Sequence, residues 1–511
     1  MWRNTAIHNN VLNYLNEIVK VKPDKIAYSD GTDSLTFRGT YDAATSIGTY
    51  LAKAGIFKKP IVIYMKKSPM EIAAFFGCVY AGCYYVPIDE EMPAERIRLI
   101  LDNVKSPVII CDDENKARAE EIATDGQQVL LYDDLSASGN DIKLLEEIAG
   151  KVIDTDPIYI VFTSGSTGIP KGVVACHRSV IDYIEQLSEV LEFNENTVFG
   201  NQSPLYFDAC LKEVYPTIKF GATDYLIPKK LFSFPVKLME YLNEYKINTI
   251  CWVASALSIV SAFKTFREVV PEYLHTVAFG SEVFPIAQFN TWRKTLPEAT
   301  FFNLYGPTEC TGMSCFYKVN REFAETDVIP IGRPFDNTEI LLLDEEGREV
   351  ANGADGEICI RGTAVTLGYY NDKERTDAVF VQNPLNPFYP ELIYKTGDIG
   401  KYNEFGELVY VSRKDYQVKH MGHRIELGEI EANVNTFPNV KLSACIYDKE
   451  NSNIILYYVG DISETDLENE LKNKVPRYML PRKAIKLDEM PFTGNGKLDR
   501  VTLKKMYFGE A

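Results

Sequence analysis

The sequence predicts an α/β protein: a large N-terminal domain of wound parallel sheets plus a small β-rich subdomain, and a small α+β C-terminal domain. Short apolar runs typical of buried strands alternate with helical segments as far as residue 304. The residue pattern changes near residue 329 and again near residue 416. A length of 511 residues is too large for one hydrophobic core and suits two or more domains.

The N-terminal part alternates between helix and strand. Apolar residues at helical spacing predict an amphipathic helix over residues 7–19, and a second helix is expected over 41–54. The longest apolar run, 72–88, is shorter than the ~20 residues that a membrane span needs. A buried helix over 70–80 that turns into a strand explains this run better. The strands expected in this part are 25–28, 60–65, 84–88 and 108–111.

A buried strand over residues 158–162 leads directly into a loop rich in Ser, Thr and Gly. Glycines let the backbone approach a ligand closely, and hydroxyl and N–H groups can surround phosphate oxygens. Lys171 adds a positive charge, but Pro170 precedes it and Gly172 follows it, so the loop is not of the Walker type. The alternative is a polar surface turn. We predict a phosphate-binding loop made of Thr163, Ser164, Gly165, Ser166, Thr167, Gly168 and Lys171.

The same alternation resumes after this loop. Helices are expected over 180–191 and 235–245. The strands expected are 249–253, 276–279 and 300–304. Each strand ends in a polar or Gly-bearing stretch, and ligands of wound parallel sheets bind beyond the carboxyl ends of the strands. A binding site is therefore expected at this edge.

Two further patterns define the C-terminal part. Residues 329–411 contain short strands broken by Gly, Asp and Asn, which indicates the β-rich subdomain. From about residue 416 the pattern indicates a compact α+β domain. There Ser463 and Asp466 resemble a capping box that opens a helix ending near Lys474. The other elements expected are a helix over 428–437 and strands over 442–447 and 453–460.

Charge and composition exclude several classes of function. The net charge is 54 − 72 = −18, which argues against nucleic acid or an anionic membrane as the main partner. The first ten residues are polar and do not resemble a secretory signal. Ten scattered cysteines contain no C-x-x-C pair, so thiols in a reducing cytoplasm are expected. Five unclustered histidines give no metal site.

Two motifs suggest nucleotide ligands. In NLYGPTE, Tyr305 is expected to be an exposed aromatic that stacks on a base, and Thr308 and Glu309 could hold phosphate and a divalent cation. The alternative is a Gly-Pro turn with an incidental tyrosine. In YKTGD, the carboxylate of Asp398 could accept both ribose hydroxyls, although this turn alone is a weak signal.

The basic residues near the C-terminus are harder to interpret alone. A charged stretch over residues 412–427 reads by itself as an interdomain linker. Lys497 lies in the turn GNGKLDR, where it is either an exposed surface group or a lysine that a small domain can carry into a site.

The ordered set of motifs resembles the adenylate-forming enzymes, the superfamily of acyl-CoA synthetases, luciferases and amino-acid adenylation domains. TSGSTGIPKG resembles the signature loop, and YGPTE, TGD, AGCYYVPID and VPRYMLP have counterparts in the same order over nearly the entire chain. The family usually has Gly where this chain has Ser412. The resemblance implies ATP and Mg2+ as cofactors, with Glu309 as the metal ligand. The ATP and AMP ligands that it implies are the phosphate loop, Asn303, Tyr305, Gly306, Thr308, Asp398, Arg413 and Lys497.

The resemblance also implies a mobile C-terminal lid. The domains expected are 1–411, a hinge over 412–415 centred on Asp415, and the lid over 416–511. Lys497 would bridge substrate carboxylate and phosphate in the first half-reaction. The loop from Lys419 to Glu426 would enter the site in the second. Together with Thr308 and Glu309, these two lysines are the catalytic candidates.

The segment Tyr206 to Cys210, YFDAC, indicates the branch within the superfamily. It resembles the segment of amino-acid adenylation domains in which an Asp, here Asp208, pairs with the substrate ammonium. Alignment of motifs gives the pocket lining: Phe207, Asp208, Ala209, Lys212, Cys251, Val277, Phe279, Gly280, Leu304, Gly312 and Met313. This lining is mostly apolar, which favours a hydrophobic or aromatic L-amino acid, with Ala209 and Gly312 leaving room. Lys212 is expected to extend to solvent, and the alternative is that it meets a polar or acidic substrate group.

The resulting functional hypothesis is a cytoplasmic ligase. It would activate an amino acid as aminoacyl-AMP and transfer it to the phosphopantetheine thiol of a carrier protein, as in nonribosomal peptide synthesis. One alternative is a D-alanine–D-alanyl carrier protein ligase. Those enzymes generally have Cys where this chain has Gly280 and a larger apolar residue where it has Ala209. Another alternative is a non-catalytic nucleotide-binding relative, which would be expected to lose Lys497. A luciferase-like oxidase is disfavoured by Asp208. Nucleic acid and membrane insertion are not expected.

Overall fold

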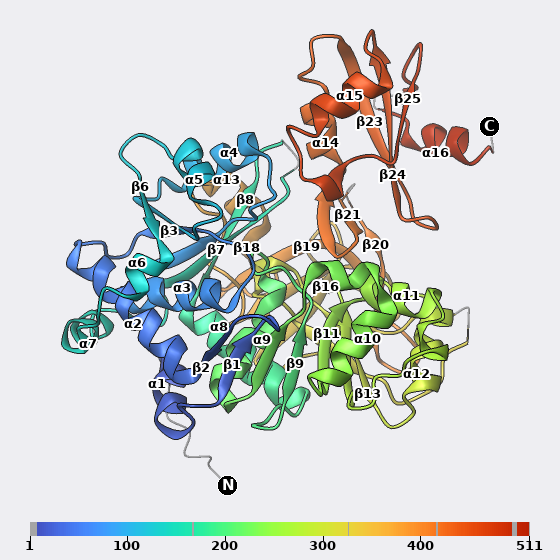
Figure 1. Cartoon of the computed structure of the whole chain (residues 1–511). Helices are drawn as coiled ribbons and strands as arrows, with labels where there is room; N and C mark the ends of the chain where they lie inside the picture. The colour runs from blue at the N-terminus through green and yellow to red at the C-terminus, as the bar shows by residue number, and fades with distance from the viewer. Residues whose placement is uncertain (1–7, 166–167, 325–326, 415–416, 493–497, 510–511) are drawn as a thin grey trace. The chain divides into compact units, whose positions relative to one another are not determined.

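The computed structural model describes residues 8–165, 168–324, 327–414, 417–492 and 498–509 (Figure 1). The chain divides into two compact units. The large unit comprises Met1–Glu90, Val104–Val161 and Val173–Ser412. The small unit comprises Glu91–Asn103, Phe162–Gly172 and Arg413–Ala511. Two internal segments thus group with the C-terminal region. The predicted hinge and domain bounds stay predictions.

One six-stranded sheet carries the strand that leads into the phosphate loop. Its order is β6 (Gln128–Leu131), β5 (Val108–Cys111), β3 (Pro60–Tyr64), β4 (Tyr84–Pro87), β7 (Pro157–Thr163) and β8 (Lys171–Cys176). The first five strands pair in parallel. The strands expected from apolar runs are confirmed, whereas β6 and β8 were not predicted.

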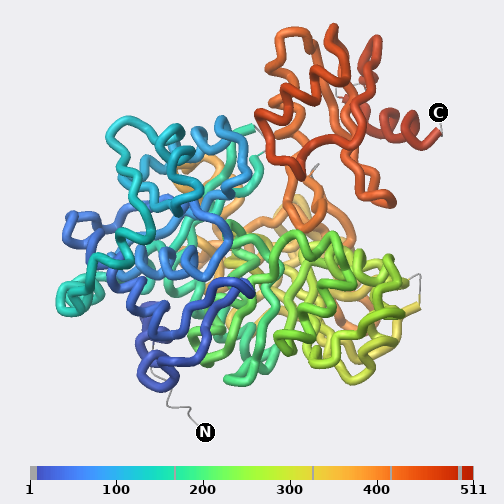
Figure 2. Tube along the Cα trace, in the orientation of Figure 1, coloured from blue at the N-terminus to red at the C-terminus, as the bar shows by residue number. Residues whose placement is uncertain are grey.

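A nine-stranded sheet forms the centre of the large unit. Its order is β15 (Arg333–Pro334), β14 (Cys315–Lys318), β13 (Thr300–Tyr305), β12 (Thr276–Gly280), β11 (Thr249–Val253), β9 (Val198–Asn201), β10 (Thr223–Leu226), β1 (Ile26–Ser29) and β2 (Ser34–Thr36). The strands from β13 to β1 pair in parallel. Figure 2 shows the dark-blue trace of β1 beside the green strands, because β1 pairs with β10.

Helices cover both faces of this sheet, as predicted for a wound sheet. On one face α8 (His177–Val190) and α9 (Leu211–Phe220) share a hydrophobic core with α1 (Leu12–Val21), α2 (Phe37–Lys53) and α3 (Pro69–Tyr80). On the other face lie α10 (Pro235–Glu244), α11 (Ala254–Ala262) and α12 (Ile286–Thr295) (Figure 1). Three further helices of the large unit are α5 (Lys116–Ile122), α6 (Tyr132–Ser136) and α7 (Ile142–Ala149).

Side-chain caps set where the N-terminal helices begin. The Thr36 hydroxyl accepts a hydrogen bond of 3.0 Å from the amide of Gly39, so α2 begins four residues before the expected start at residue 41. Ser68 caps α3 in the same way, and Pro69 occupies its first turn.

The expected β-rich subdomain is confirmed. It is an antiparallel sheet of β16 (Thr338–Leu343), β17 (Gly356–Gly362), β18 (Phe380–Gln382), β19 (Leu392–Tyr402) and β20 (Leu408–Arg413), with the helix α13 (Lys373–Val379).

The small unit contains the expected α+β pattern. Its elements are α4 (Ala94–Val104, whose last residue falls in the large unit), a hairpin of β21 (Gln417–His420) and β22 (His423–Glu426), α14 (Leu427–Val434), a sheet of β23 (Val440–Asp448), β24 (Asn453–Gly460) and β25 (Lys483–Lys486), α15 (Glu464–Leu471) and α16 (Arg500–Phe508). Ser463 caps α15 by accepting a hydrogen bond from Asp466, which confirms the predicted start, and the helix ends three residues earlier than expected.

Candidate active site

Tyr305 ends β13, and its ring is buried. Only 4% of its surface is accessible, so the expectation of an exposed aromatic at this position was wrong. Its hydroxyl donates a hydrogen bond of 2.6 Å to Oδ2 of Asp398. Burial, together with the charge of Asp398, holds the pKa of the Tyr305 hydroxyl well above its usual range, so the group remains a donor. The structure thus joins the residues that the resemblance assigns to adenine and ribose.

Asp398 lies inside β19 rather than in a surface turn. Gly397 adopts a positive φ of 74°, and the pairing of β17 with β19 is irregular near this point. The amide of Asp398 donates to the hydroxyl of Thr396 at 2.9 Å, and that hydroxyl donates to the carbonyl of Ile358 at 2.7 Å. A bulge therefore orients this carboxylate, which explains why the TGD motif alone resembled an ordinary turn.

Glu309 is fully buried in the short helical turn Thr308–Cys310 that follows β13. Its Oε1 accepts a hydrogen bond of 2.7 Å from the hydroxyl of Tyr369, and its carbonyl accepts one of 3.0 Å from the amide of Thr366. The preceding Gly306 has no room for a Cβ, because the backbone of residues 312–314 folds against it. The backbone therefore fixes the Glu309 carboxylate one turn beyond Tyr305.

Asn303 uses its side chain for structure. Its amide nitrogen donates a hydrogen bond of 2.8 Å to the carbonyl of Pro330. The residue pairs with Phe279 across the two strands, on the sheet face opposite to that of Leu304. Its expected role as a nucleotide ligand stays a prediction.

Asp208 opens a helical turn that runs directly into α9, and only 9% of its surface is accessible. Its charge is the largest electrostatic contribution that raises the pKa values of Tyr159 and Tyr183, after burial itself. Asp208 therefore lies beside these two rings, on the inner side of the sheet. Phe207, which packs against Tyr206, and Ala209 are both partly exposed.

Strand register corrects two residues of the expected pocket lining. Val277 and Phe279 belong to the core on the α10–α12 side of the sheet. Ala278, between them, belongs to the core that contains Cys251 and Leu304, as does Met313. Side chains alternate between the two faces of a strand. An alignment shifted by one residue therefore selects side chains on the opposite face.

Two glycines of the expected pocket lining, Gly280 and Gly312, have structural roles. A Cβ at Gly280 would overlap the carbonyl oxygen of Leu304, so this glycine permits close approach of two strands. Gly312 has a positive φ of 90°, and a Cβ there would lie 3.0 Å from the ring of Tyr183. Tyr183 therefore fills the space that Gly312 was expected to leave. No sequence motif marks Tyr183, since it looks like any other apolar position of α8.

Lys212 does not extend to solvent. It lies in the first turn of α9 with 3% of its surface accessible, so the expectation that it would reach water was wrong. It makes no hydrogen bond or ion pair with any residue that the structure describes.

The described part of the phosphate loop belongs to the small unit, where its donors meet carboxylates. The amide of Gly165 donates a hydrogen bond of 2.9 Å to Oε2 of Glu429, which also pairs with the buried Arg96. The ammonium of Lys171 lies 3.2 Å from Oε1 of Glu426. The loop donors therefore already hold anionic oxygens, which is the chemistry that a phosphate group offers.

Several expected residues lie outside the described residues or at their margins. Ser166, Thr167, Asp415 and Lys497 are outside, so their roles stay predictions. Lys419 lies on β21 and pairs across the hairpin with Arg424. Arg413 is the last residue of β20.

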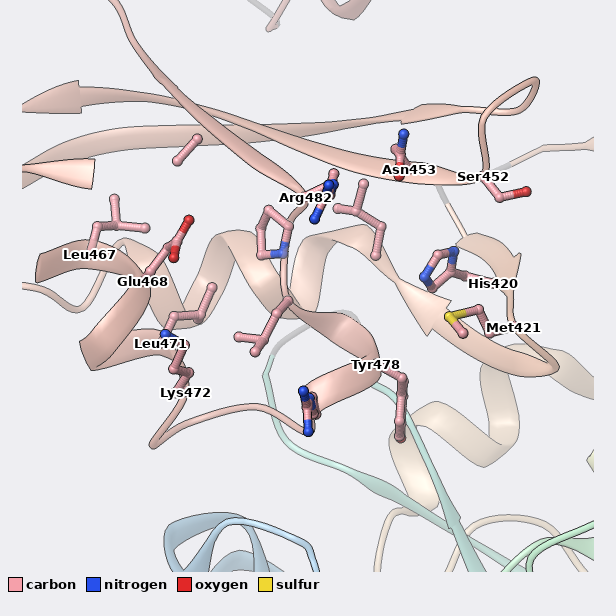
Figure 3. Close-up of a pocket in the computed structure, with 15 residues that line it drawn as sticks. His420, Met421, Ser452, Asn453, Leu467, Glu468, Leu471, Lys472, Tyr478 and Arg482 are labelled. Carbon is pink, nitrogen blue, oxygen red and sulfur yellow. The ribbon is translucent and has the colours of Figure 1, made fainter. Parts of the chain in front are cut away.

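A cavity of about 470 Å³ opens in the small unit. His420 and Met421, at the turn of the β21–β22 hairpin, lie at one end of it, and Leu467 and Glu468 lie at the other (Figure 3). None of the predicted nucleotide or substrate ligands lines this cavity. We therefore assign it no part of the site.

Comparison with known proteins identifies the family. The family model described as "AMP-binding enzyme" matches residues 15–370, more than half of the chain. The chain belongs to the AMP-binding enzyme family. Membership of this family implies that ATP is used.

Relatives within the AMP-binding enzyme family cover nearly the whole chain. A D-alanine–D-alanyl carrier protein ligase of Staphylococcus haemolyticus (strain JCSC1435) is 30% identical over 503 residues, which are 96% of this chain and 98% of that protein. Bacitracin synthase 1 of Bacillus licheniformis is 32% identical over 490 residues, which are 94% of this chain but only 9% of that protein. A solved NRPS protein containing adenylation and PCP domains, bound to a vinylsulfonamide inhibitor, matches with a TM-score of 0.83 and 25% identity. The match covers 98% of this chain and 84% of that one.

Two searches of the described residues gave negative results. No helix among them is long and apolar enough to cross a membrane. No group of three or more His, Cys, Asp or Glu side chains among them could hold a metal ion.

Proposed function

We propose that this AMP-binding enzyme activates an amino acid as aminoacyl-AMP, releases pyrophosphate, and then transfers the aminoacyl group to the phosphopantetheine thiol of a carrier protein. The observation that carries the proposal is the buried carboxylate of Asp208 beside Tyr159 and Tyr183. A buried carboxylate favours a cationic partner, and the ammonium of an amino acid supplies one. The names of the relatives support both the amino acid and the carrier protein.

In the first step, a carboxylate oxygen of the amino acid attacks the α-phosphorus of ATP, and pyrophosphate leaves. Tyr305 and Asp398 would hold the adenosine part, with their mutual hydrogen bond fixing the carboxylate. Thr308, the phosphate loop and Lys497 would neutralise the charge that develops on phosphate oxygens. The chain's contribution is therefore mostly positioning and electrostatic stabilisation.

The residues present fit a magnesium ion. Carboxylate oxygens are ligands that Mg2+ prefers, and Tyr369 holds the Glu309 carboxylate in a defined orientation. Glu309 would hold the ion together with oxygens of the nucleotide. When bound, Mg2+ supplies positive charge beside the phosphates.

In the second step, the carrier thiol attacks the carbonyl carbon of the aminoacyl-AMP, and AMP leaves as the thioester forms. The hinge at Asp415 would exchange Lys497 for the hairpin that carries Lys419. In this scheme, each half-reaction would use its own catalytic segment of the C-terminal part. The scattered cysteines, without a C-x-x-C pair, favour the reducing cytoplasm as its location.

D-Alanine is the second candidate substrate, because full-length relatives are D-alanine–D-alanyl carrier protein ligases. Gly280 argues against it. A Cys in its place would drive a Cβ into the Leu304 carbonyl, so this pocket wall differs from the one that the resemblance associates with D-alanine.

The test is ATP–pyrophosphate exchange with proteinogenic amino acids, D-alanine and aryl acids, followed by mass measurement of a holo carrier protein. We expect exchange that depends on one amino acid or a small group, and an aminoacyl adduct on the carrier. Exchange with D-alanine alone would select the second candidate. No exchange with any acid would indicate a non-catalytic relative.

A further inference from the structure

Among the described residues, Lys212 differs from two nearby lysines in making no hydrogen bond or ion pair. Lys67 is partly buried and donates a hydrogen bond of 2.8 Å to Oδ1 of Asn201. Lys219, on the same helix as Lys212, pairs with Glu185 at 2.7 Å. Lys212 makes neither kind of contact within the described part of the chain. A buried ammonium without a partner is unfavourable, so a ligand with negative charge would stabilise it.

Lys212 lies on the same helical face as Asp208. The turn Asp208–Cys210 continues without a break into α9, and residues four positions apart on a helix are neighbours. The charge of Lys212 acts on Cys251, and the charge of Asp208 acts on Tyr183, which in turn lies against Gly312. Both charges therefore act on residues of the core that contains Cys251 and Tyr183.

A second buried polar group near Asp208 also has no partner. The hydroxyl of Tyr159 is buried and makes no hydrogen bond to any described residue. Buried hydroxyls are normally satisfied, and this one lies where the Asp208 charge is felt. Lys212 and the Tyr159 hydroxyl are thus both buried without a hydrogen-bond partner among the described residues, as expected of groups that meet a polar ligand.

Glu213, the next residue, makes no ion pair with Lys212. The positive charge of Lys212 opposes the effect of burial on the pKa of the Glu213 carboxyl, but no hydrogen bond or ion pair joins the two side chains among the described residues. Neither carboxylate oxygen of Glu213 has a hydrogen-bond partner among the described residues. Burial raises the pKa of the Glu213 carboxyl well above its usual range, which favours its neutral form.

We propose that Lys212 pairs with a side-chain carboxylate of the substrate, so that this enzyme activates an acidic amino acid. This inference rests on the proposed function and names its substrate class. Asp208 would take the α-ammonium and Lys212 the side-chain carboxylate, which leaves the α-carboxylate to react with ATP. The two opposite charges, one helical turn apart, would fix the orientation of a substrate that carries the complementary pair.

The experiment is ATP–pyrophosphate exchange on the whole chain, with L- and D-glutamate, L- and D-aspartate, their amides, leucine and D-alanine. We expect an acidic amino acid to exceed its own amide in kcat/KM by about 100-fold, because the amide leaves the lysine charge unpaired. Lys212→Met should remove this preference and bring the amide or an apolar residue to equal or higher activity. Binding of a fluorescent ATP analogue, unchanged in Lys212→Met, would show that the variant is folded.

Lys219→Met is the matched control, since it makes the same substitution on the same helix at a lysine that already has a partner. It should keep the preference for the acid. A neutral best substrate whose preference survives Lys212→Met would overturn the inference and leave the proposed function standing. If Lys212→Met loses nucleotide binding, Lys212→Gln gives the same readout, and an intact acid preference in it would also overturn the inference. No exchange with any amino acid would overturn both.

Discussion

The hydroxyl of Tyr305 donates a hydrogen bond of 2.6 Å to the carboxylate of Asp398, although 93 residues separate them in the sequence. Tyr305 ends a strand of the central sheet, and Asp398 lies within the β-rich subdomain. This one contact therefore joins the two parts of the large unit that the family resemblance assigns to adenosine.

Tyr305→Phe removes a hydrogen-bond donor from the buried carboxylate of Asp398. We expect the free energy of unfolding to fall by about 1–3 kcal/mol, and ATP to bind more weakly because Asp398 loses its orientation. Calorimetric titration with ATP and denaturant unfolding measure the two effects. Tyr458→Phe removes a hydroxyl that donates to the carbonyl of Ile462 in the small unit, and it should leave ATP affinity unchanged. Wild-type affinity in Tyr305→Phe would remove this contact from the nucleotide site.

Asp208→Asn keeps the size of the side chain and removes its charge. If Asp208 pairs with the substrate ammonium, the preference for an amino acid over its des-amino analogue should fall by about 2–5 kcal/mol in transition-state binding. The kcat/KM values for the two acids in pyrophosphate exchange give this number. Asp154→Asn, at an exposed ion pair with Arg178, is the control and should keep the preference. An unchanged preference in Asp208→Asn would place Asp208 outside the substrate site.

Gly280→Ala tests the close approach of two strands. The added Cβ would overlap the carbonyl oxygen of Leu304, so β12 and β13 must shift. We expect a loss of about 1–3 kcal/mol in stability, as for other overpacked cores. Gly150→Ala adds the same atom 3.6 Å from the nearest carbonyl oxygen, and it should be tolerated. Equal thermal midpoints of unfolding for the two variants would contradict the register described here.

His177 predicts a pH dependence of stability. Burial lowers the pKa of His177 to about 4. The unfolded chain, with an ordinary pKa near ~6.5, therefore takes up a proton first as the pH falls. The stabilisation is complete above this unfolded value and is lost between about pH 6.5 and pH 4, with about 2 kcal/mol lost from pH 7 to pH 5. Urea unfolding at several pH values gives the free energy of unfolding as a function of pH. This free energy should fall less steeply with falling pH for His177→Gln than for the wild type. An equal pH dependence in the two proteins would contradict the assignment.

The sequence was sufficient for the fold class and for the order of the motifs. Short apolar runs predicted the buried strands. A polar loop after such a run predicted the edge of the parallel sheet at which the strands have their carboxyl ends. The contact between Tyr305 and Asp398 agrees with the motif assignment, but no local pattern predicts that the ring is buried. The ring is buried in a hydrophobic core that includes Val173 and Tyr394, which come from distant strands.

The pocket lining was predicted less well, for physical reasons. The motif alignment along β12 was shifted by one residue. It selected Val277 and Phe279 instead of Ala278, which lies on the opposite face of the strand because side chains alternate. The burial of Lys212 is decided by what packs against α9, which the chain near residue 212 does not encode. Tyr183, which fills the space beside Gly312, comes from a helix that bears no motif.

The central claim is that this chain forms aminoacyl-AMP. The most direct test is to incubate the enzyme with ATP, Mg2+ and each of a panel of amino acids, without a carrier protein, and then to quench the reaction. Mass spectrometry of the bound small molecules should then show one aminoacyl-AMP, with pyrophosphate released in equal amount. It should vanish when the amino acid is replaced by its des-amino analogue. Bound ATP without any acyl adenylate, for every amino acid tested, would contradict the account.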